Sequence, residues 1–275
     1  MTYFTSYEAA PSLFSIYEPG DVYCTLIAGS ERAWLFDTGY GFCDIKEAVA
    51  SLTHLPLTIV NSHGHLDHAG GNFRFDQEIY IHPYERQVYD FYQGEKESLM
   101  DRMWSLYLQG KKPRPWPEGF DRQEYYSYKP CKFTDLSDRQ RFDLGGRIVE
   151  AIFFPGHTKG CVALYDHQSG LLLSGDNLGH SIWIMFEQSA SLEEYRSMLC
   201  RIKDEFHIRG IMGSHYGGIY PPSLIDTVIQ CIDRRNDGAS TVFTHPRKKF
   251  HALRRKVPLE GIPGAENLYL VYPSD

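Results

Sequence analysis

The most constraining feature of this 275-residue chain is the segment SHGHLDHAGG at residues 62–71. Four side chains able to bind a metal, His63, His65, Asp67 and His68, fall within six residues, directly after the apolar run LTIV. A loop at the end of a strand can direct neighbouring side chains to different sides. Two imidazoles can then bind one ion while the carboxylate and the last imidazole face a second ion. The segment therefore predicts a two-metal site.

Three other fragments repeat the same form, an apolar run that ends in a potential ligand beside glycine. They are IFFPGHTKG with His157, LLLSGDN with Asp176 and GIMGSHYGG with His215. A fourth fragment, AWLFDTG, places Asp37 at the end of an apolar run. Ligands that come from the ends of several strands can meet at one edge of a sheet, as a preorganised metal site requires.

Apolar and β-branched runs bounded by glycine or proline predict strands, and helical patterns are interspersed with them. The predicted strands are Leu13–Tyr17, Val22–Ala28, Ala33–Phe36, Leu57–Asn61, Glu78–Ile81, Arg147–Phe154, Cys161–Tyr165 and Leu171–Ser174. The predicted helices are Cys43–Leu52, Tyr84–Gln109, Leu192 to about Phe206 and Leu224 to about Arg234. Ser191 is the expected N-cap of the third helix, because two glutamates follow it in the first turn. This order of elements predicts an α/β fold of two sheets with helices on their outer faces.

We expect a single domain over residues 1–275, with a helical and loop insertion at 84–137. The insertion is rich in aromatic residues and contains the proline-punctuated segment GKKPRPWPEGF. It could form a lid over a pocket, since long loops inside compact domains are often functional. It could equally be an ordinary helix packed on the core, followed by a surface loop. Exposed aromatic side chains in the insertion would also suit a homodimer.

The composition of the chain limits the classes of binding partner that we expect. A formal net charge of −7 disfavours nucleic acid, because phosphate contacts need a basic surface. The N-terminus lacks a basic and apolar leader, and no run approaches the roughly 18 apolar residues that span a bilayer. The six cysteines are dispersed without a CxxC pair, so we expect reduced thiols. These features predict a cytoplasmic protein that acts on a small molecule and has no membrane partner.

The motifs HGHLDH, PGHTKG, SGD and GSH, in this order, resemble those of the metallo-β-lactamase fold superfamily of metal-dependent hydrolases. The resemblance covers roughly Val22 to Gly217. It implies an α/β fold of the αββα sandwich type, with the metals at one edge of the two sheets.

Carried over residue by residue, the resemblance also implies a role for each candidate. The first metal would be bound by His63, His65 and His157, the second by Asp67, His68 and His215, and Asp176 would bridge the two. Asp37 matches an aspartate that hydrogen-bonds to the metal-binding loop, and such a carboxylate orients an imidazole and sets its tautomer. The sequence HTKGC stands where HTPGS is more usual, but the changed positions, Lys159 and Cys161, are not ligand positions.

Two residues choose between branches of the superfamily. Asp176 stands where zinc β-lactamases have a cysteine, which disfavours antibiotic hydrolysis. His65 stands where the flavin-coupled di-iron oxidases of this fold have a glutamate, which disfavours oxygen reduction. The remaining resemblance is to the glyoxalase II and lactonase branches.

The resemblance implies a hydrolytic mechanism. Two divalent ions about 3.5–4 Å apart can share a hydroxide, because they lower the pKa of the parent water. We expect this metal-bridged hydroxide to attack an ester, thioester, lactone or similar small substrate, with Asp67 or Asp176 passing a proton to the leaving group. Zinc is the expected metal, while iron and manganese also suit histidine and aspartate ligands.

Two other activities of the same fold remain open. A persulfide dioxygenase-like oxidoreductase would use a single iron held by two or three of these histidines and would consume oxygen. A phosphodiesterase or nuclease would use the same two-zinc ligands, but the acidic balance of the chain counts against it.

Residues near the predicted ligands are candidates for substrate contact. His180 follows Asp176 by four residues, and Tyr216 lies next to His215, so either could contact substrate or simply pack. The basic runs Arg247–Lys249 and Arg254–Lys256 could bind an anionic substrate, as a C-terminal basic cluster does in glyoxalase II. A charge run is more often a solvated face of the protein.

Overall fold

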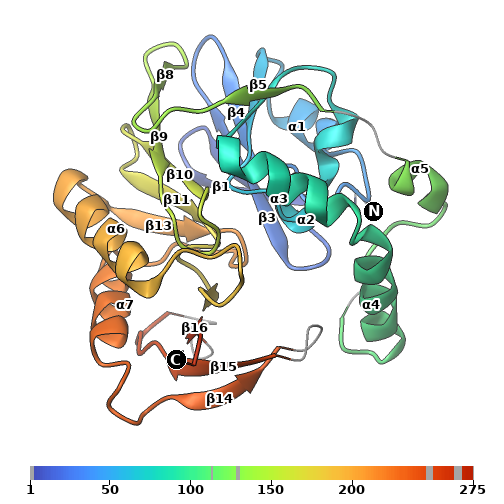
Figure 1. Ribbon diagram of the computed structural model, residues 1–275. Helices are drawn as coiled ribbons and strands as arrows, with labels where there is room; N and C mark the ends of the chain where they lie inside the picture. Colours follow the sequence, from blue (N-terminus) through green and yellow to red (C-terminus); the bar gives the residue numbers. More distant parts are fainter. Residues whose placement is uncertain (1–2, 113, 128–130, 246–249, 263–267, 275) are drawn as a thin grey trace. The chain divides into compact units, whose positions relative to one another are not determined.

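The computed structural model describes residues 3–112, 114–127, 131–245, 250–262 and 268–274. The chain forms two compact units, Met1–Glu150 and Ala151–Asp275, and the boundary between them falls within strand β9 (Ile148–Phe153) (Figure 1). None of the helices in the described ranges has both the length and the apolar character that crossing a membrane would require.

The first unit combines many short strands with short helices. Its elements are β1 (Thr5–Ala10), β2 (Leu13–Glu18), β3 (Val22–Ala28), β4 (Ala33–Phe36), α1 (Ile45–Leu52), β5 (Leu57–Val60), α2 (Leu66–Ala69), the 3-10 helix η1 (Gly70–Arg74), β6 (Ile79–Ile81), α3 (Pro83–Gln93), α4 (Lys96–Leu108), α5 (Arg122–Tyr126), β7 (Phe133–Asp135) and β8 (Arg141–Asp143). A seven-stranded sheet runs in the order β1 to β7. Strands β1 to β4 are antiparallel, and β4 to β7 are parallel.

The parallel part of this sheet determines where the candidate residues of the first unit lie. Phe36 at the end of β4 is paired with Val60 at the end of β5, so the segments that follow both strands leave the same edge. Asp37 follows β4 directly, and its backbone N–H donates to the carbonyl of Val60 at 2.8 Å. The histidine-rich loop follows β5. Parallel pairing therefore places Asp37 beside the start of that loop.

The predicted insertion is more divided than its sequence pattern suggested. The prediction of one helix over Tyr84–Gln109 is wrong. Helix α3 ends at Gln93, and the next residue, Gly94, caps it with a backbone N–H that donates to the carbonyl of Phe91 at 3.2 Å. Two of its aromatic side chains, Trp116 and Tyr125, are 5% and 1% exposed and pack with Phe42 in a buried cluster of the first unit. These two residues therefore favour the hypothesis that the insertion packs on the core over the hypothesis that it forms a lid.

The second unit contains the remaining elements. They are most of β9, then β10 (Val162–Asp166), β11 (Leu171–Gly175), β12 (Ser181–Trp183), α6 (Leu192–Glu205), β13 (Gly210–Gly213), α7 (Ser223–Asp233), β14 (Thr241–Thr244), β15 (His251–Lys256) and β16 (Tyr269–Tyr272). One sheet has the order β13-β11-β10-β9-β8, in which β8 pairs with the first residues of β9, and a second sheet has the order β12-β16-β15-β14. Helices α6 and α7 contribute Tyr195, Leu199 and Val228 to the core of this unit.

Two features of the second unit bear on the sequence predictions. Ser191 is the N-cap of α6 as expected, and it forms a reciprocal capping box with Glu194. Strands β14, β15 and β16 were not predicted. HALRRK in β15 is mostly polar or charged and lacks the apolar run that marked the other strands, whereas YLVY in β16 has such a run and was overlooked. The short strands β1, β7, β8 and β12 were missed for the same lack of a long apolar run.

Candidate functional site

The histidine-rich loop of the first unit brings four predicted ligands together. The ring centroids of His63 and His65 lie 4.5 Å apart, and those of His63 and His68 lie 4.1 Å apart. Potential ligand atoms of His63 and His65, of His63 and His68, and of Asp67 and His68 lie within 4.8 Å of each other in each pair. The side chains of His63 and His68 are fully buried, whereas that of Asp67 is 25% exposed. The loop thus forms a compact donor set of imidazoles and one carboxylate.

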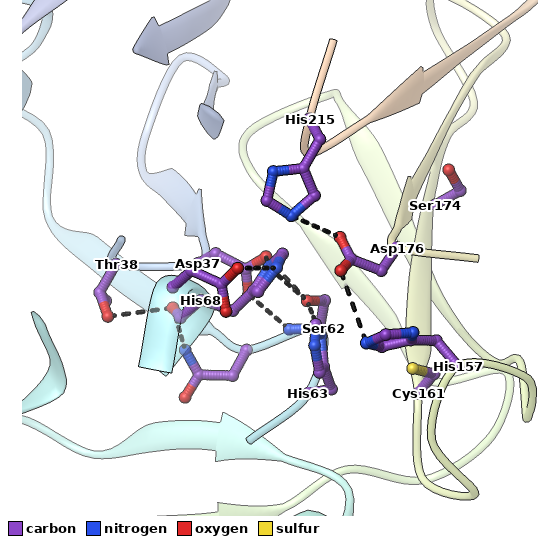
Figure 2. A network of polar contacts seen from close by, with 12 residues as sticks. Asp37, Thr38, Ser62, His63, His68, His157, Cys161, Ser174, Asp176 and His215 are labelled. Atoms are coloured by element: carbon purple, nitrogen blue, oxygen red, sulfur yellow. Dashed lines mark hydrogen bonds and ion pairs between the residues drawn. The ribbon is translucent and has the colours of Figure 1, made fainter. Parts of the chain in front are cut away.

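Asp37 is hydrogen-bonded to this loop. Its Oδ1 accepts from the backbone N–H of Ser62 at 2.6 Å, and its Oδ2 accepts from the Ser62 hydroxyl at 2.7 Å (Figure 2). The same Oδ2 lies 2.8 Å from Nδ1 of His68. A carboxylate can only accept at this position, so Nδ1 of His68 carries the proton and Nε2 presents the lone pair. Asp37 therefore fixes both the loop backbone and the tautomer of one histidine.

Ser62, which the motif search did not single out, sets the tautomer of a second histidine. Its hydroxyl has one proton and donates it to Asp37, so it accepts from Nδ1 of His63, 2.9 Å away. Nε2 of His63 then presents its lone pair. A serine next to a histidine is too common for the sequence to reveal this role, which becomes visible only when Asp37 is placed beside it.

Helix α3 contacts the loop from the predicted insertion. The carboxylate of Glu85 is fully buried and accepts from the backbone N–H of Gly64 at 2.8 Å. The ring of Tyr92 lies 4.3 Å from that of His65. Gly64 allows this close approach, because a Cβ there would lie 2.5 Å from the backbone nitrogen of Tyr89. Part of the insertion therefore contacts and stabilises the metal-binding loop. No local sequence motif indicated this role.

The second unit holds the other three predicted ligands together. Nε2 of His157 lies 3.6 Å from Oδ2 of Asp176, and Nε2 of His215 lies 3.3 Å from Oδ1 of the same carboxylate (Figure 2). Strands β11 and β13 are parallel neighbours with Gly175 opposite Gly213, and Asp176 and His215 follow them at the same edge. Asp176 thus turns one oxygen to each histidine, as a carboxylate shared between two ions would.

The surroundings of His157 fix its position and its tautomer. Its Nδ1 lies 2.8 Å from the carbonyl oxygen of Trp183, which can only accept, so Nε2 presents the lone pair. The backbone N–H of His157 donates to Oδ1 of Asn177 at 2.7 Å, and its carbonyl accepts from the Ser189 hydroxyl at 2.7 Å. Asn177 directly follows Asp176, so a position next to the SGD motif could have been flagged. The sequence alone could not indicate the contacts of Trp183 and Ser189, because the fold brings these residues to His157.

The remaining sequence candidates have more ordinary surroundings. His180 is half-buried, and its carbonyl accepts from the backbone N–H of Tyr269 at 3.4 Å. Tyr216 packs its ring 4.4 Å from that of Tyr220. Arg255 forms two hydrogen bonds of 2.7 Å with Asp237, so this member of the basic run has a structural partner. The run Arg247–Lys249 lies outside the described residues.

One buried acid of the first unit stands apart from the predicted ligands. Glu18 is fully buried and accepts from the backbone N–H groups of Tyr40 and Phe42 at 2.7 and 3.3 Å. Burial raises the pKa of its carboxyl to about 8, although the backbone hydrogen bonds oppose that rise. Glu18 therefore anchors the segment that follows Asp37.

The donor set fits divalent transition-metal ions. In each of three imidazoles, those of His63, His68 and His157, the hydrogen bond at Nδ1 leaves Nε2 as the nitrogen with a lone pair. Metal-ligating histidines usually have this arrangement, with one nitrogen on the metal and the other hydrogen-bonded to a carboxylate, carbonyl or hydroxyl group. Histidine nitrogens together with aspartate oxygens suit zinc, iron and manganese.

Comparisons with known proteins agree with these motifs. A family model described as "Metallo-beta-lactamase superfamily" matches residues 17–206. The chain is 24% identical over 206 residues to the acyl-coenzyme A thioesterase MBLAC2 of Homo sapiens, covering 70% of this chain and 71% of the relative. It is 27% identical over 134 residues to a hydroxyacylglutathione hydrolase of Synechococcus sp., covering 49% of this chain and 39% of that protein.

Solved structures show the fold. The metallo-beta-lactamase family protein TTHA1429 from Thermus thermophilus superposes with a TM-score of 0.62 at 21% identity, covering 84% of this chain and 83% of that one. The superfamily protein ST1585 from Sulfolobus tokodaii superposes with a TM-score of 0.56 at 15% identity, covering 85% and 90%. The α/β fold class expected from the sequence, an αββα sandwich, is therefore confirmed. Because the family model matches more than half of its length, this chain belongs to the metallo-beta-lactamase superfamily of metallo-hydrolases.

Proposed function

We propose that this protein is a binuclear metal-dependent hydrolase of small carbonyl substrates, with thioesters as the first class to test. The observation that carries the proposal is the shared carboxylate Asp176, which turns one oxygen to His157 and the other to His215. A carboxylate between two imidazoles suits a site with two ions better than a site with one.

The proposed ligand set is the one that the sequence motifs indicate. His63, His65 and His157 would hold one ion, Asp67, His68 and His215 would hold the other, and Asp176 would contribute to both. The tautomers fixed at His63, His68 and His157 support this assignment, because each presents Nε2 as a donor. When bound, such ions activate water as a nucleophile and polarise a carbonyl group. Zinc is the expected metal, with iron and manganese as the alternatives to be measured.

The chain's own residues supply orientation and proton transfer. Asp37 and Ser62 hold the histidine-rich loop, and Asn177 and Ser189 hold the backbone of His157. Asp67 is the better placed of the two candidate acids to pass a proton to a leaving group. Its side chain is 25% exposed, against 11% for Asp176, so it is the more accessible to a substrate.

The relatives support thioesters over the other carbonyl classes. Their names describe hydrolysis of acyl-coenzyme A and of hydroxyacylglutathione, and both are thioesters. We further propose that the protein works in the cytoplasm, which suits its six cysteine thiols, and that it acts without nucleic acid or membrane partners.

The test compares hydrolysis by metal-stripped and reloaded protein. The full chain is stripped with a chelator and reloaded with Zn²⁺, Fe²⁺ or Mn²⁺. It is then assayed on acyl thioesters, lactones and a phosphodiester while oxygen uptake is recorded. Asp176→Asn is run beside Asp166→Asn, a matched change at a fully buried aspartate of the same unit outside the proposed ligand set.

The proposal predicts metal-dependent thioester or lactone hydrolysis that Asp176→Asn lowers by at least about 100-fold, whereas Asp166→Asn stays within a few fold of the wild type. Equal activity in Asp176→Asn and the wild type overturns the proposal. Oxygen uptake with one iron per chain would instead identify the protein as a dioxygenase. Activity on the phosphodiester alone would identify it as a phosphodiesterase.

A further inference from the structure

The four-stranded sheet β12-β16-β15-β14 has two different faces (Figure 1). Leu253, Leu270 and Tyr272 point to the core that α6 and α7 cover. On the opposite face, strand register places Trp183 beside Val271 and Phe243 beside Ala252. Side chains alternate between faces along a strand, so these residues share the face turned away from the helices.

This second face carries a cluster of partly exposed aromatic side chains, which we call the aromatic face. It comprises Trp183, Phe186, Phe243, Phe250 and Tyr269, packed against buried Met185, Ala252 and Val271. The ring of Trp183 lies 5.8 Å from that of Phe243 and 5.9 Å from that of Phe186. These five side chains are half-buried, and the buried ring of His245 packs among them, 5.6 Å from that of Trp183 and 5.1 Å from that of Phe250. Partly exposed apolar side chains that gather in one place can form a binding surface.

The aromatic face continues directly from a proposed metal ligand. The carbonyl of Trp183 is the acceptor that orients His157, at 2.8 Å from its Nδ1. The ring of Phe186 lies edge-on to that of His157, with centroids 5.4 Å apart. All of these residues belong to the second unit. One short segment therefore both orients the ligand and contributes side chains to the aromatic face.

Much of the aromatic face lies beyond the residues that the family model matches. The family model ends at residue 206, whereas Phe243, Phe250 and Tyr269 come from later residues. Six of the seven proposed ligands lie in the matched region, and His215 follows it. A surface that touches a proposed ligand is suited to selecting the substrate.

We infer that the aromatic face binds the aliphatic acyl chain of the substrate; this inference rests on the proposed hydrolase function. The acyl chain is bonded to the carbonyl carbon that is attacked, so it must begin beside the metal ligands. A surface of aromatic rings that begins at His157 meets that requirement. A contact between two copies of the chain would not need to reach a metal ligand.

The test uses a series of thioesters with one thiol and acyl chains of increasing length, from acetyl to dodecanoyl, with metal-loaded full chain. Phe243→Ala removes an aromatic side chain that lies on the face but away from His157. Val242→Ala is the matched control, because Val242 is the preceding residue of β14, points to the other side and is 71% exposed.

For the wild type, kcat/KM should rise with chain length by up to about fourfold for each methylene buried. Phe243→Ala should lower kcat/KM by a factor that grows with chain length, to more than about tenfold for dodecanoyl. Val242→Ala should follow the wild-type curve. An unchanged slope in Phe243→Ala, or a loss equal at every chain length, overturns the inference.

A binding measurement separates this inference from the proposed function. If the wild type hydrolyses no thioester, the function fails, and binding of a dodecyl thioether analogue is then measured by calorimetry. If binding weakens in Phe243→Ala and not in Val242→Ala, the inference that this face binds the acyl chain stands. If the analogue does not bind, the inference is overturned. Sedimentation of both variants completes the test, because a dimer that dissociates only in Phe243→Ala would identify the face as a subunit interface and overturn the inference.

Discussion

Asp37 has a backbone conformation that aspartate seldom adopts, with φ at 67°. Positive φ costs free energy for a residue with a Cβ and persists where the surrounding contacts determine it. Here both carboxylate oxygens are used, by the backbone and hydroxyl of Ser62 and by the imidazole of His68. The unusual backbone is therefore explained by what the side chain holds in place.

Asp37→Ala should weaken metal binding by about 10- to 100-fold, because His68 and the loop backbone lose their acceptor. Asp21→Ala is the matched control, since Asp21 also has positive φ, at 83°, on the exposed turn between β2 and β3. Titration against a chromophoric chelator measures both. Equal affinities in the two variants would show that Asp37 is only a turn residue.

Glu18 should make stability depend on pH. The pKa of its carboxyl is about 8 in the folded protein and 4.5 when unperturbed, so folding takes up a proton between these values. The folded state binds more protons there, and stability should therefore fall as pH rises from about 5 to 8, by at most about 1.4 kcal/mol per pH unit.

Urea unfolding of the metal-stripped chain at pH 5.5 and 7.5, for the wild type and Glu18→Gln, measures this effect. Glutamine does not titrate, so the wild type should lose stability relative to the variant at the higher pH. Other titrating groups cancel in the difference. A difference that is the same at both pH values would contradict the raised pKa.

The sequence identified the candidate ligands, but it did not identify the residues that hold them in place. HGHLDH marks ligands because four metal-competent side chains within six residues are rarely accidental. Ser62, Glu85 and the carbonyl of Trp183 carry no such signal. Their roles depend on which distant residue the fold brings near them, and a backbone carbonyl has no identity in the sequence.

At the scale of elements, apolar patterning located the strands that end in ligands. Strands β4 and β11 are buried on both faces, as are the last two residues of β5, and they therefore appear as continuous apolar runs. Strand β15 has basic residues on both of its faces and was missed. The break between α3 and α4 was missed as well, because glycine within a helical pattern does not by itself end a helix.

Helix α3 should stabilise the histidine-rich loop through Gly64. Gly64→Ala should cost about 1–3 kcal/mol of stability and weaken metal binding, because its Cβ would lie 2.5 Å from the backbone of Tyr89. Gly94→Ala is the control, since its Cβ would meet only the carbonyl of Phe91 at 3.4 Å. Thermal unfolding with and without metal compares them, and similar shifts in the two variants would argue against the brace.

At the scale of the molecule, the chain has two compact units, and the family match at residues 17–206 extends over the boundary between them. The single domain over residues 1–275 stays a prediction. A single domain should unfold as one cooperative unit, and metal bound to its folded state should stabilise it as a whole.

The intact protein should therefore unfold in one transition, with equal calorimetric and van't Hoff enthalpies, and metal should move that transition upward as a whole. Differential scanning calorimetry of stripped and reloaded protein measures this. Two separable transitions, of which metal shifts only one, would assign the metal to a single unit.

The central claim is the proposed two-metal site, and metal content tests it most directly. Protein purified without added metal is analysed by plasma mass spectrometry beside His65→Ala, His215→Ala and the control His54→Ala, an exposed histidine that follows α1. The proposal predicts about two equivalents of metal, zinc first, in the wild type and the control, and a loss in both ligand variants. One equivalent in every protein, insensitive to His215→Ala, would contradict it.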